Sequence, residues 1–158
     1  MHNTAKGKIE NARSRFAGLL QESITYRSSW ELKAFGILDK FTKMGIIKAW
    51  ASEKSVFDYV SPVDEKNHRY YMDITMLSIN DDGRDKVTFI EIKPLAQTTA
   101  PRQTAKKSDR VYRNELRTYV VNNAKWNAVK DFCVLENENL GYAKYDFIIW
   151  SEKELNIT

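Results

Sequence analysis

The sequence predicts an α/β fold, because segments with helical and strand-like patterns alternate along its 158 residues. Apolar residues recur at helical spacing after Ser28, two strand-like segments flank the turn residues Asn80 to Gly83, and a compact apolar run occupies residues 145–150. A chain of this length can bury a hydrophobic core large enough for stability without disulfides or bound metals. We therefore expect one domain that spans residues 1–158.

A helix is predicted to begin after Ser28, a residue type that caps helix N-termini, and to end at Gly45. Its apolar positions are Trp30, Ala34, Phe35, Ile37, Leu38 and Phe41. Residues 47–60 mix β-branched and aromatic side chains and stop before Pro62, which predicts one or two strands. Upstream, residues 1–25 are expected to form a basic arm or a short helix.

The later part of the chain is predicted to contain a loop, two helices and a strand. Residues 94–108 are polar, basic and interrupted by prolines, which predicts a mobile loop. Residues 111–121 and 124–133 each carry apolar side chains at helical spacing, and residues 145–150 have strand length. The single cysteine, Cys133, cannot form an internal disulfide, so we expect a buried thiol in a reducing compartment.

Composition and charge narrow the classes of protein to which the chain can belong. The chain is 42% hydrophobic and 29% charged, which is ordinary for a soluble globular protein. No stretch approaches the roughly 18 apolar residues of a membrane span, and residues 1–6 lack an apolar core, so we expect no membrane association and no secretion. A net charge of +4 would suit a polyanionic partner such as DNA, without establishing one.

Three ionisable residues are predicted to converge on a β-hairpin formed by residues 69–79 and 86–92. Asp73 lies in the first strand, and Glu91 and Lys93 lie at the end of the second. Because side chains alternate along a strand, Glu91 and Lys93 are aimed at the same face. The pattern resembles the active-site motif that carboxylates and a lysine form in metal-dependent nucleases.

Hydrolysis of phosphodiesters requires such a grouping, because carboxylates hold Mg²⁺ ions that activate water and neutralise charge on the phosphate. Asp73 and Glu91 are the candidate ligands, Lys93 can orient the water or stabilise the phosphate, and Glu31 on the first helix can complete the metal shell. Such spacing also arises by chance, and alternating charges on a strand are commonly a solvated face. Against that interpretation, Phe89, Ile90 and Ile92 make the strand apolar and suited to burial. Charged side chains in a buried strand are rare unless they are paired or functional.

Basic residues near this motif are candidates for contacts with DNA. The densest group is Arg102, Lys106, Lys107, Arg110 and Arg113, which could bind the DNA backbone or form a solvated loop. Arg69 could contact a phosphate or have a surface role, and Lys125 could point at the scissile phosphate. Its neighbour Trp126 is expected to be a core residue.

Five segments, in order, resemble the head-completion nucleases of tailed bacteriophages, over roughly residues 26–155. They are Tyr26-Arg27-Ser28-Ser29-Trp30-Glu31, Ser61-Pro62-Val63-Asp64, His68-Arg69-Tyr70-Tyr71-Met72-Asp73, Glu91-Ile92-Lys93-Pro94 and Asn123-Ala124-Lys125-Trp126. That family is similar to the endonuclease subunit of Tn7-type transposases. The resemblance implies a restriction-endonuclease-like core of the PD-(D/E)xK type, with a central mixed β-sheet flanked by helices. It also implies a Mg²⁺ cofactor, for which Mn²⁺ can substitute.

The resemblance assigns roles to individual residues. It implies that the metal-binding residues are Glu31, Asp73, Glu91 and Ile92 and that Lys93 is the catalytic lysine. Gln97 matches a family position and is a candidate for DNA binding. Met72 replaces the proline that gives the motif its name, which is tolerable because that proline shapes the backbone and binds no metal.

The resemblance further implies an endonuclease that completes the DNA-filled head before the tail attaches. DNA would be its substrate and portal, neck or head proteins its partners, in the host cytoplasm or in the head-neck region of the virion. Two alternatives remain. One is a structural head-neck protein that binds DNA or portal while its carboxylates form only ion pairs, and the other is a transposase-like or repair nuclease that needs a partner protein.

Overall fold

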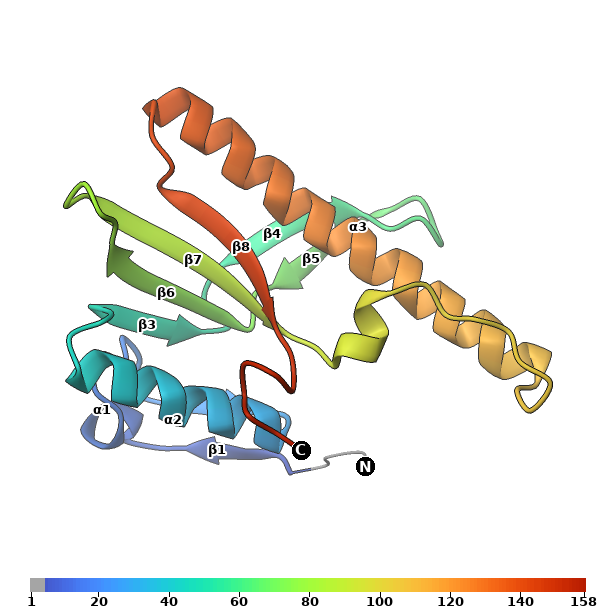
Figure 1. Cartoon of the computed structure of the whole chain (residues 1–158), viewed down its shortest axis with the longest axis horizontal. Coiled ribbons are helices and arrows are strands. Elements are labelled where there is room, and N and C mark those ends of the chain that lie inside the picture. The colour runs from blue at the N-terminus through green and yellow to red at the C-terminus, as the bar shows by residue number, and fades with distance from the viewer. Residues whose placement is uncertain (1–4) are drawn as a thin grey trace.

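The computed structural model describes residues 5–158 and contains a four-stranded mixed sheet at its centre (Figure 1). The strand order is β3 (Ala49–Ser52), β6 (Ile74–Ile79), β7 (Asp85–Ile92) and β8 (Tyr145–Trp150). The strand β6 is antiparallel to both of its neighbours, β3 and β7, whereas β7 and β8 are parallel. The predicted central mixed sheet is therefore confirmed.

Helices cover the two faces of this sheet. The helix α2 (Ser29–Lys43) packs against one face, where its Phe35 and Leu38 meet Ile90 of β7 in one buried cluster. The helix α3 (Asp109–Leu140) packs against the other face, where Trp126 joins Phe89 in a second cluster. Since neighbouring residues of a strand face opposite ways, Glu91 is on the side of α3.

Two small antiparallel ribbons extend this core. The strands β4 (Val56–Val60) and β5 (Asn67–Tyr71) form one ribbon, which packs near α3. The strands β1 (Gly7–Ile9) and β2 (Ile24–Tyr26) form the other. One helical turn, α1 (Ala12–Arg15), lies between β1 and β2 in the sequence.

The expectation for residues 1–25 needs correction from residue 5 onward, while residues 1–4 lie outside the described part of the chain. The segment contains a short helix, α1, but it also forms the strands β1 and β2, and it is not an arm that stands away from the protein. Its side chains of Ala12, Phe16, Leu19 and Ile24 are buried in the same cluster as α2. Ala12, Phe16 and Leu19 do have helical spacing, but the helix ends at Arg15, because Phe16 has an extended backbone and Gly18 a left-handed one.

The two helices predicted within residues 111–133 are one continuous helix, α3, of 32 residues. Ser108 caps its N-terminus by accepting a hydrogen bond from the N–H of Val111, and Gly141 ends it with a left-handed backbone. The break between the two predicted helices was expected at Asn122 and Asn123. In the structure Asn122 is buried, and the side-chain amide of Asn123 donates to the carbonyl of Tyr119. That bond to the preceding turn satisfies the Asn123 amide without ending the helix.

Residues 69–79 were expected as one strand, and this prediction is wrong at Met72 and Asp73. The strand β5 ends at Tyr71 and pairs with β4, whereas β6 begins at Ile74 and pairs with β7. Met72 is fully buried in the second cluster, and its N–H donates to the carbonyl of Ser55. The hairpin of β6 and β7 is confirmed, but Asp73 immediately precedes it.

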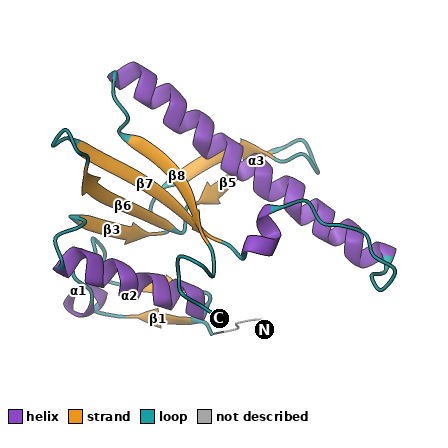
Figure 2. Cartoon of the chain, viewed as in Figure 1, coloured by secondary structure: helices purple, strands orange, loops and turns teal. Residues whose placement is uncertain are grey.

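Other predicted elements are confirmed, including the helix from Ser28, the strands within residues 47–60 and the last strand (Figure 2). Cys133 is buried, as expected. Residues 94–108 contain a short 3₁₀ helix, η1 (Leu95–Thr98), followed by irregular chain that runs back along α3. Their mobility stays a prediction. Within residues 5–158, no helix combines the length and the apolar character needed to cross a membrane.

Candidate active site

The structure brings Asp73, Glu91 and Lys93 together where β6 begins and β7 ends. Because Ile74 pairs with Ile90, Asp73 stands beside Glu91 at the next position of the hairpin. Oδ2 of Asp73 accepts a 2.7 Å hydrogen bond from the N–H of Ile92. Here the carboxylate replaces a backbone acceptor, since β6 does not extend far enough to supply one.

The carboxyl group of Asp73 is held in an environment that opposes its ionisation. The residue is half-buried at the surface, yet its carboxyl group is enclosed by protein atoms. Burial, and next the negative charge of Glu91, raise the pKa of Asp73 well above its usual range. The hydrogen bond from Ile92 and the charge of Lys93 oppose this rise. Ionisation of Asp73 beside Glu91 is therefore disfavoured, and a bound cation would favour it.

Glu91 is buried, with 4% of the residue exposed, and both of its oxygens have partners. Lys93 Nζ lies 3.1 Å from Oε1, and the Tyr70 hydroxyl donates a short hydrogen bond to Oε2. Burial and the nearby charge of Glu91 raise the pKa of Tyr70 far above its usual range, so its hydroxyl keeps its proton and remains a donor. Two donors from different elements thus fix the Glu91 carboxylate in one orientation.

Tyr70 is a site residue that the sequence reasoning missed. It lies in the His68-to-Asp73 segment, from which only Arg69 and Asp73 were assigned roles. A tyrosine that follows an arginine in a strand can face inward, because side chains alternate, and a buried hydroxyl requires a partner. Its partner is Glu91, on a different strand and 21 residues later, so the pairing was not visible in the local pattern.

The helix α3 contributes Lys125 and Trp126 to the same region. The ammonium of Lys125 lies 5.5 Å from the centre of the Tyr70 ring and 5.8 Å from that of Tyr59. This places a positive charge beside the residue that binds Glu91. That Lys125 points at the scissile phosphate stays a prediction. Trp126 is buried as a core residue, as predicted, and its Nε1 has no hydrogen-bond partner among residues 5–158.

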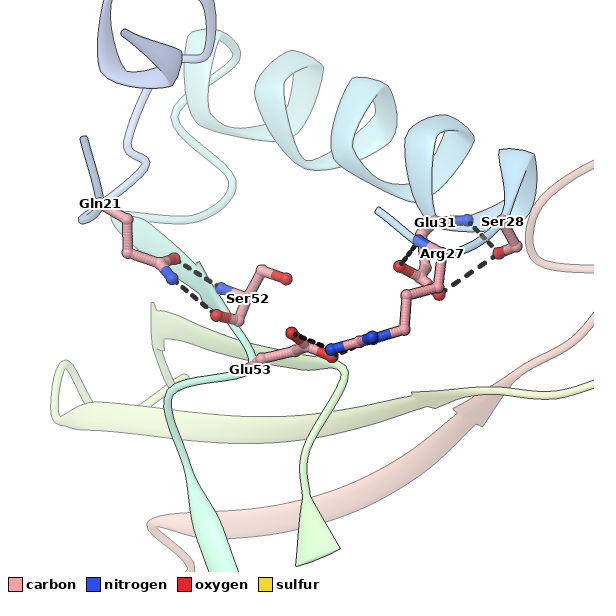
Figure 3. A network of polar contacts seen from close by, with 6 residues as sticks. All are labelled: Gln21, Arg27, Ser28, Glu31, Ser52 and Glu53. Carbon is pink, nitrogen blue, oxygen red and sulfur yellow. Dashed lines mark hydrogen bonds and ion pairs between the residues drawn. The ribbon is translucent and has the colours of Figure 1, made fainter. Parts of the chain in front are cut away.

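Glu31 occupies the first turn of α2, where it takes part in capping the helix (Figure 3). Its Oε2 accepts a 2.8 Å hydrogen bond from the N–H of Arg27, and its own N–H donates to the hydroxyl of Ser28. Burial raises the pKa of Glu31. Its charge also contributes to the raised pKa of Asp73.

The structure does not assemble Glu31 with Asp73 and Glu91 into one ligand cluster. Among residues 5–158, no three His, Cys, Asp or Glu side chains lie close enough together to hold a metal ion. Glu31 therefore acts on the pair through its charge in this conformation. The sequence placed it correctly near the start of a helix, but the capping contacts direct its carboxylate toward the backbone of Arg27.

A second ionic network, also missed from the sequence, lies between α2 and the start of β6. The guanidinium of Arg27 forms an ion pair with Glu53, at 2.9 Å between Nε and Oε1 (Figure 3). Glu53 has a left-handed backbone with φ of 52°, and its N–H donates to the carbonyl of Asp73. Gln21 makes two hydrogen bonds to the backbone of Ser52 and so supports this bend. The network therefore holds the backbone carbonyl of Asp73 through the N–H of Glu53.

The remaining predicted DNA contacts are divided among three places. Gln97, Arg102 and Lys107 line a cleft of about 1090 Å³ between η1, the following loop and α3. Lys106 is exposed outside that cleft. Arg69 is exposed beside the buried Tyr70 and therefore projects from the opposite face of the β4–β5 ribbon.

Comparisons with known proteins relate the chain to nucleases. The model of the family described as TnsA-like endonuclease N terminal matches residues 46–141, a range that includes Asp73, Glu91 and Lys93 but not Glu31. The chain is also 38% identical over 112 residues to the head completion nuclease of Enterobacteria phage T4. The aligned region covers 69% of this chain and 70% of that protein. No solved structure matches the chain.

The family match also bears on the fold. Domains of this family have a restriction-endonuclease-like core, and the mixed sheet with helices on both faces agrees with that architecture. The predicted fold class is therefore confirmed. The chain belongs to the family of TnsA-like endonucleases.

Proposed function

We propose that this protein is a Mg²⁺-dependent DNA endonuclease that finishes the ends of packaged phage DNA during head completion. The observation that carries the proposal is the pairing of Asp73 with the buried Glu91 beside Lys93. Two adjacent carboxylates at the end of a strand, accompanied by a lysine, are the groups that metal-assisted phosphodiester hydrolysis requires. Membership of an endonuclease family supports the same reaction.

The donor set fits a hard divalent cation, for which oxygen ligands are preferred. Asp73 and Glu91 would hold it, and the carbonyl oxygen of Ile92 is the one group of that residue that could join them, since its side chain is apolar and its N–H, which donates to Asp73, cannot ligate a cation. When bound, Mg²⁺ would lower the pKa of a water molecule and neutralise charge on the phosphate. Mn²⁺, with similar preferences, would substitute. The raised pKa of Asp73 agrees with this assignment, because burial and the charge of Glu91 disfavour the ionised carboxylate and a bound cation would favour it.

The protein's own groups have separate roles in this proposal. Lys93 orients the attacking water or stabilises the negative phosphate, since its ammonium already lies against Glu91. Tyr70 keeps the Glu91 carboxylate in position through its hydroxyl. Glu31 increases the negative potential at Asp73 from α2 and thereby favours cation binding.

The biological part of the proposal rests on the relative whose name states head completion. The substrate would be duplex or branched DNA at the packaged end, and portal, neck or head proteins would be the partners. The protein would act in the host cytoplasm, in or beside the head-neck region of the assembling virion. The extent of the match, 70% of the relative's length, supports a shared role.

The decisive experiment measures cleavage of plasmid and of linear phage DNA by the purified full chain, with Mg²⁺, with Mn²⁺ and with a chelator. We expect cleavage only with the metals, and none by Asp73→Asn or Glu91→Gln. A matched control is Glu138→Gln, which alters an exposed acidic residue near the C-terminal end of α3. Metal-independent cleavage, or full activity of the folded Asp73 variant, would overturn the assignment.

Inactivity of the isolated chain would be resolved by adding portal and neck proteins. Activity that appears only then would identify a nuclease that needs a partner. Inactivity in every mixture, together with retained DNA binding, would identify a structural head-neck protein. The head-completion role itself is tested by adding the wild-type protein or the Asp73 variant to DNA-filled heads that lack this protein and then counting heads that accept tails.

A further inference from the structure

The segment formed by residues 99–121 contributes little to the core. It is called the basic arm from here on and is distinct from the N-terminal residues 1–25. It comprises the irregular chain after η1 and the first part of α3, and none of its residues is buried. Figure 1 shows this part of α3 running past the edge of the sheet, with the preceding chain folded back along it. The buried residues of α3 begin only at Asn122. Packing against the sheet therefore does not explain why the helix extends so far.

The charge of the basic arm is unusual in comparison with the rest of the chain. Residues 99–121 contain six basic and two acidic residues, while the whole chain has a net charge of +4. The arm therefore accounts for the entire net charge, and the remainder is balanced. An exposed segment with this charge is complementary to a polyanion.

Within the arm, Arg110, Arg113 and Arg117 form an arginine stripe along one side of α3. A helix turns about 100° per residue, so the three side chains project within an arc of about 60°. All three are exposed, and none forms an ion pair with another of the residues 5–158. The two acidic residues of the arm are engaged elsewhere, because Glu115 pairs with Lys107 and Asp109 accepts a hydrogen bond from Gln103.

The position of the arginine stripe relative to the candidate site follows from the geometry of the helix. Lys125 marks the level of the carboxylates on α3, because its ammonium lies over the ring of Tyr70. With a rise of about 1.5 Å per residue, Arg117 lies about 12 Å and Arg110 about 22 Å farther along the axis. Around the helix, Arg110 and Arg117 lie about 60° and 80° from Lys125 and Arg113 about 120°, so the stripe is offset from the side of Lys125 by about a quarter turn.

We propose that the basic arm binds the backbone of duplex DNA that flanks the cut, with the arginine stripe on phosphates about four to seven base pairs from the scissile bond. This distance follows from the 12 to 22 Å span and a rise of about 3.4 Å per base pair. The inference rests on the proposed function and extends it to the form of DNA at the site.

Duplex DNA is favoured over a single strand by the shape and composition of the stripe. The stripe is on the convex surface of a helix and includes no aromatic side chain, since Tyr112 projects from a different side of α3 by its spacing. Single-strand sites generally combine positive charge with aromatic rings on which bases stack. Guanidinium groups on a convex helix are instead suited to phosphates at the edge of a groove.

The experiment compares the full chain with the triple variant Arg110→Gln, Arg113→Gln, Arg117→Gln and with a control triple variant. The control, Lys40→Gln, Lys66→Gln, Lys153→Gln, removes the same charge from exposed positions outside the arm. Affinity for a duplex of about 24 base pairs is measured against salt concentration, with Ca²⁺ in place of Mg²⁺. We expect the arm variant to bind at least tenfold more weakly and its log-log salt slope to fall by about 2 to 3. The control triple should keep the wild-type slope.

A second measurement locates the contact. Neutral methylphosphonate linkages are placed one at a time along the duplex, and we expect those about four to seven base pairs from the cut to weaken binding of the wild type but not of the arm variant. Equal losses in the two triple variants, an unchanged slope, or an equal loss of slope on a single strand of the same length would each overturn the proposal. The Asp73→Asn variant separates DNA binding by the basic arm from the proposed nuclease function. It should lose cleavage while keeping the wild-type salt slope.

Discussion

Tyr70 and Glu91 are joined by a hydrogen bond that links the β4–β5 ribbon to the central sheet. The bond crosses between two sheets, and the residues at both of its ends are buried. Glu91 would otherwise have one oxygen enclosed by protein without a donor, a costly arrangement for a charged group. Tyr70 is therefore the residue through which the ribbon holds the candidate ligand in position.

Removing this hydroxyl should affect catalysis more than DNA binding. We expect Tyr70→Phe to lower turnover about tenfold and to destabilise the protein by about 1 to 2 kcal/mol, because one oxygen of Glu91 loses its donor. Steady-state cleavage assays and urea unfolding measure the two effects. Tyr71→Phe, at the exposed neighbouring position, is the control. Unaltered turnover in Tyr70→Phe would show that Lys93 alone suffices to orient Glu91.

Asp73→Asn should abolish cleavage while stabilising the metal-free protein near neutral pH. The pKa of Asp73 is raised in the folded state by burial and by Glu91, so the folded protein binds this proton more tightly than the unfolded chain. Its contribution to stability is therefore greatest below the unfolded pKa of about 4 and is lost as the pH rises toward the folded pKa. The asparagine variant does not incur this loss.

Thermal unfolding in a chelator from about pH 4 to pH 8 tests this effect. The advantage of Asp73→Asn should shrink as the pH falls, and Mg²⁺ should stabilise the wild type but not the variant. Asp58→Asn, an exposed position on β4, should show neither effect. A variant less stable than the wild type throughout this range would indicate that the carboxylate is needed for its hydrogen bond with Ile92.

Lys93→Ala should lower turnover by about two orders of magnitude or more with nearly unchanged affinity for DNA. Its ammonium lies against Glu91 and is expected to act mainly in the transition state. Turnover and the dissociation constant are measured separately, the latter in Ca²⁺. Lys86→Ala removes a charge from the other end of β7 and is the control. A loss confined to affinity would mean that Lys93 only holds the phosphate.

Glu31→Gln should raise the Mg²⁺ concentration needed for half-maximal cleavage several-fold, with partial rescue by Mn²⁺ or excess Mg²⁺. Glu31 adds negative potential at Asp73, and an amide of the same shape removes it while still accepting a hydrogen bond from Arg27. A metal titration of the cleavage rate gives the midpoint, and circular dichroism checks the helix. An unchanged midpoint would assign Glu31 only to capping α2.

Lys106 and Lys107 should differ in their contribution to DNA binding although they are adjacent. Lys107 is paired with Glu115 and also donates to the carbonyl of Arg102, whereas Lys106 is exposed. We expect Lys106→Gln to lower the log-log salt slope by about 0.9 and Lys107→Gln to change it less, because the latter ammonium is already engaged. Removing Arg102 together with both lysines should have the largest effect. Equal slopes for the two single variants would show that DNA displaces Glu115.

The sequence by itself determined the elements whose pattern is local. The helix after Ser28, the hairpin of β6 and β7 and the strand β8 follow from apolar periodicity and from capping and turn residues that act within a few positions. The proximity of Asp73 to Glu91 and Lys93 also followed, because two segments joined by a short turn have few alternatives to pairing.

Only the tertiary structure decided the features that depend on contacts between distant segments. The two predicted helices form the single helix α3 because the buried Asn122 and the hydrogen-bonded Asn123 fit within it. The predicted strand is interrupted at Met72 because that side chain enters the second core cluster. The pairing of Tyr70 with Glu91 and the separation of Glu31 from the carboxylate pair likewise depend on how the ribbon and α2 pack. Periodicity specifies which face of an element is buried, but the partner that this face meets is selected by packing and by the need to satisfy buried polar groups.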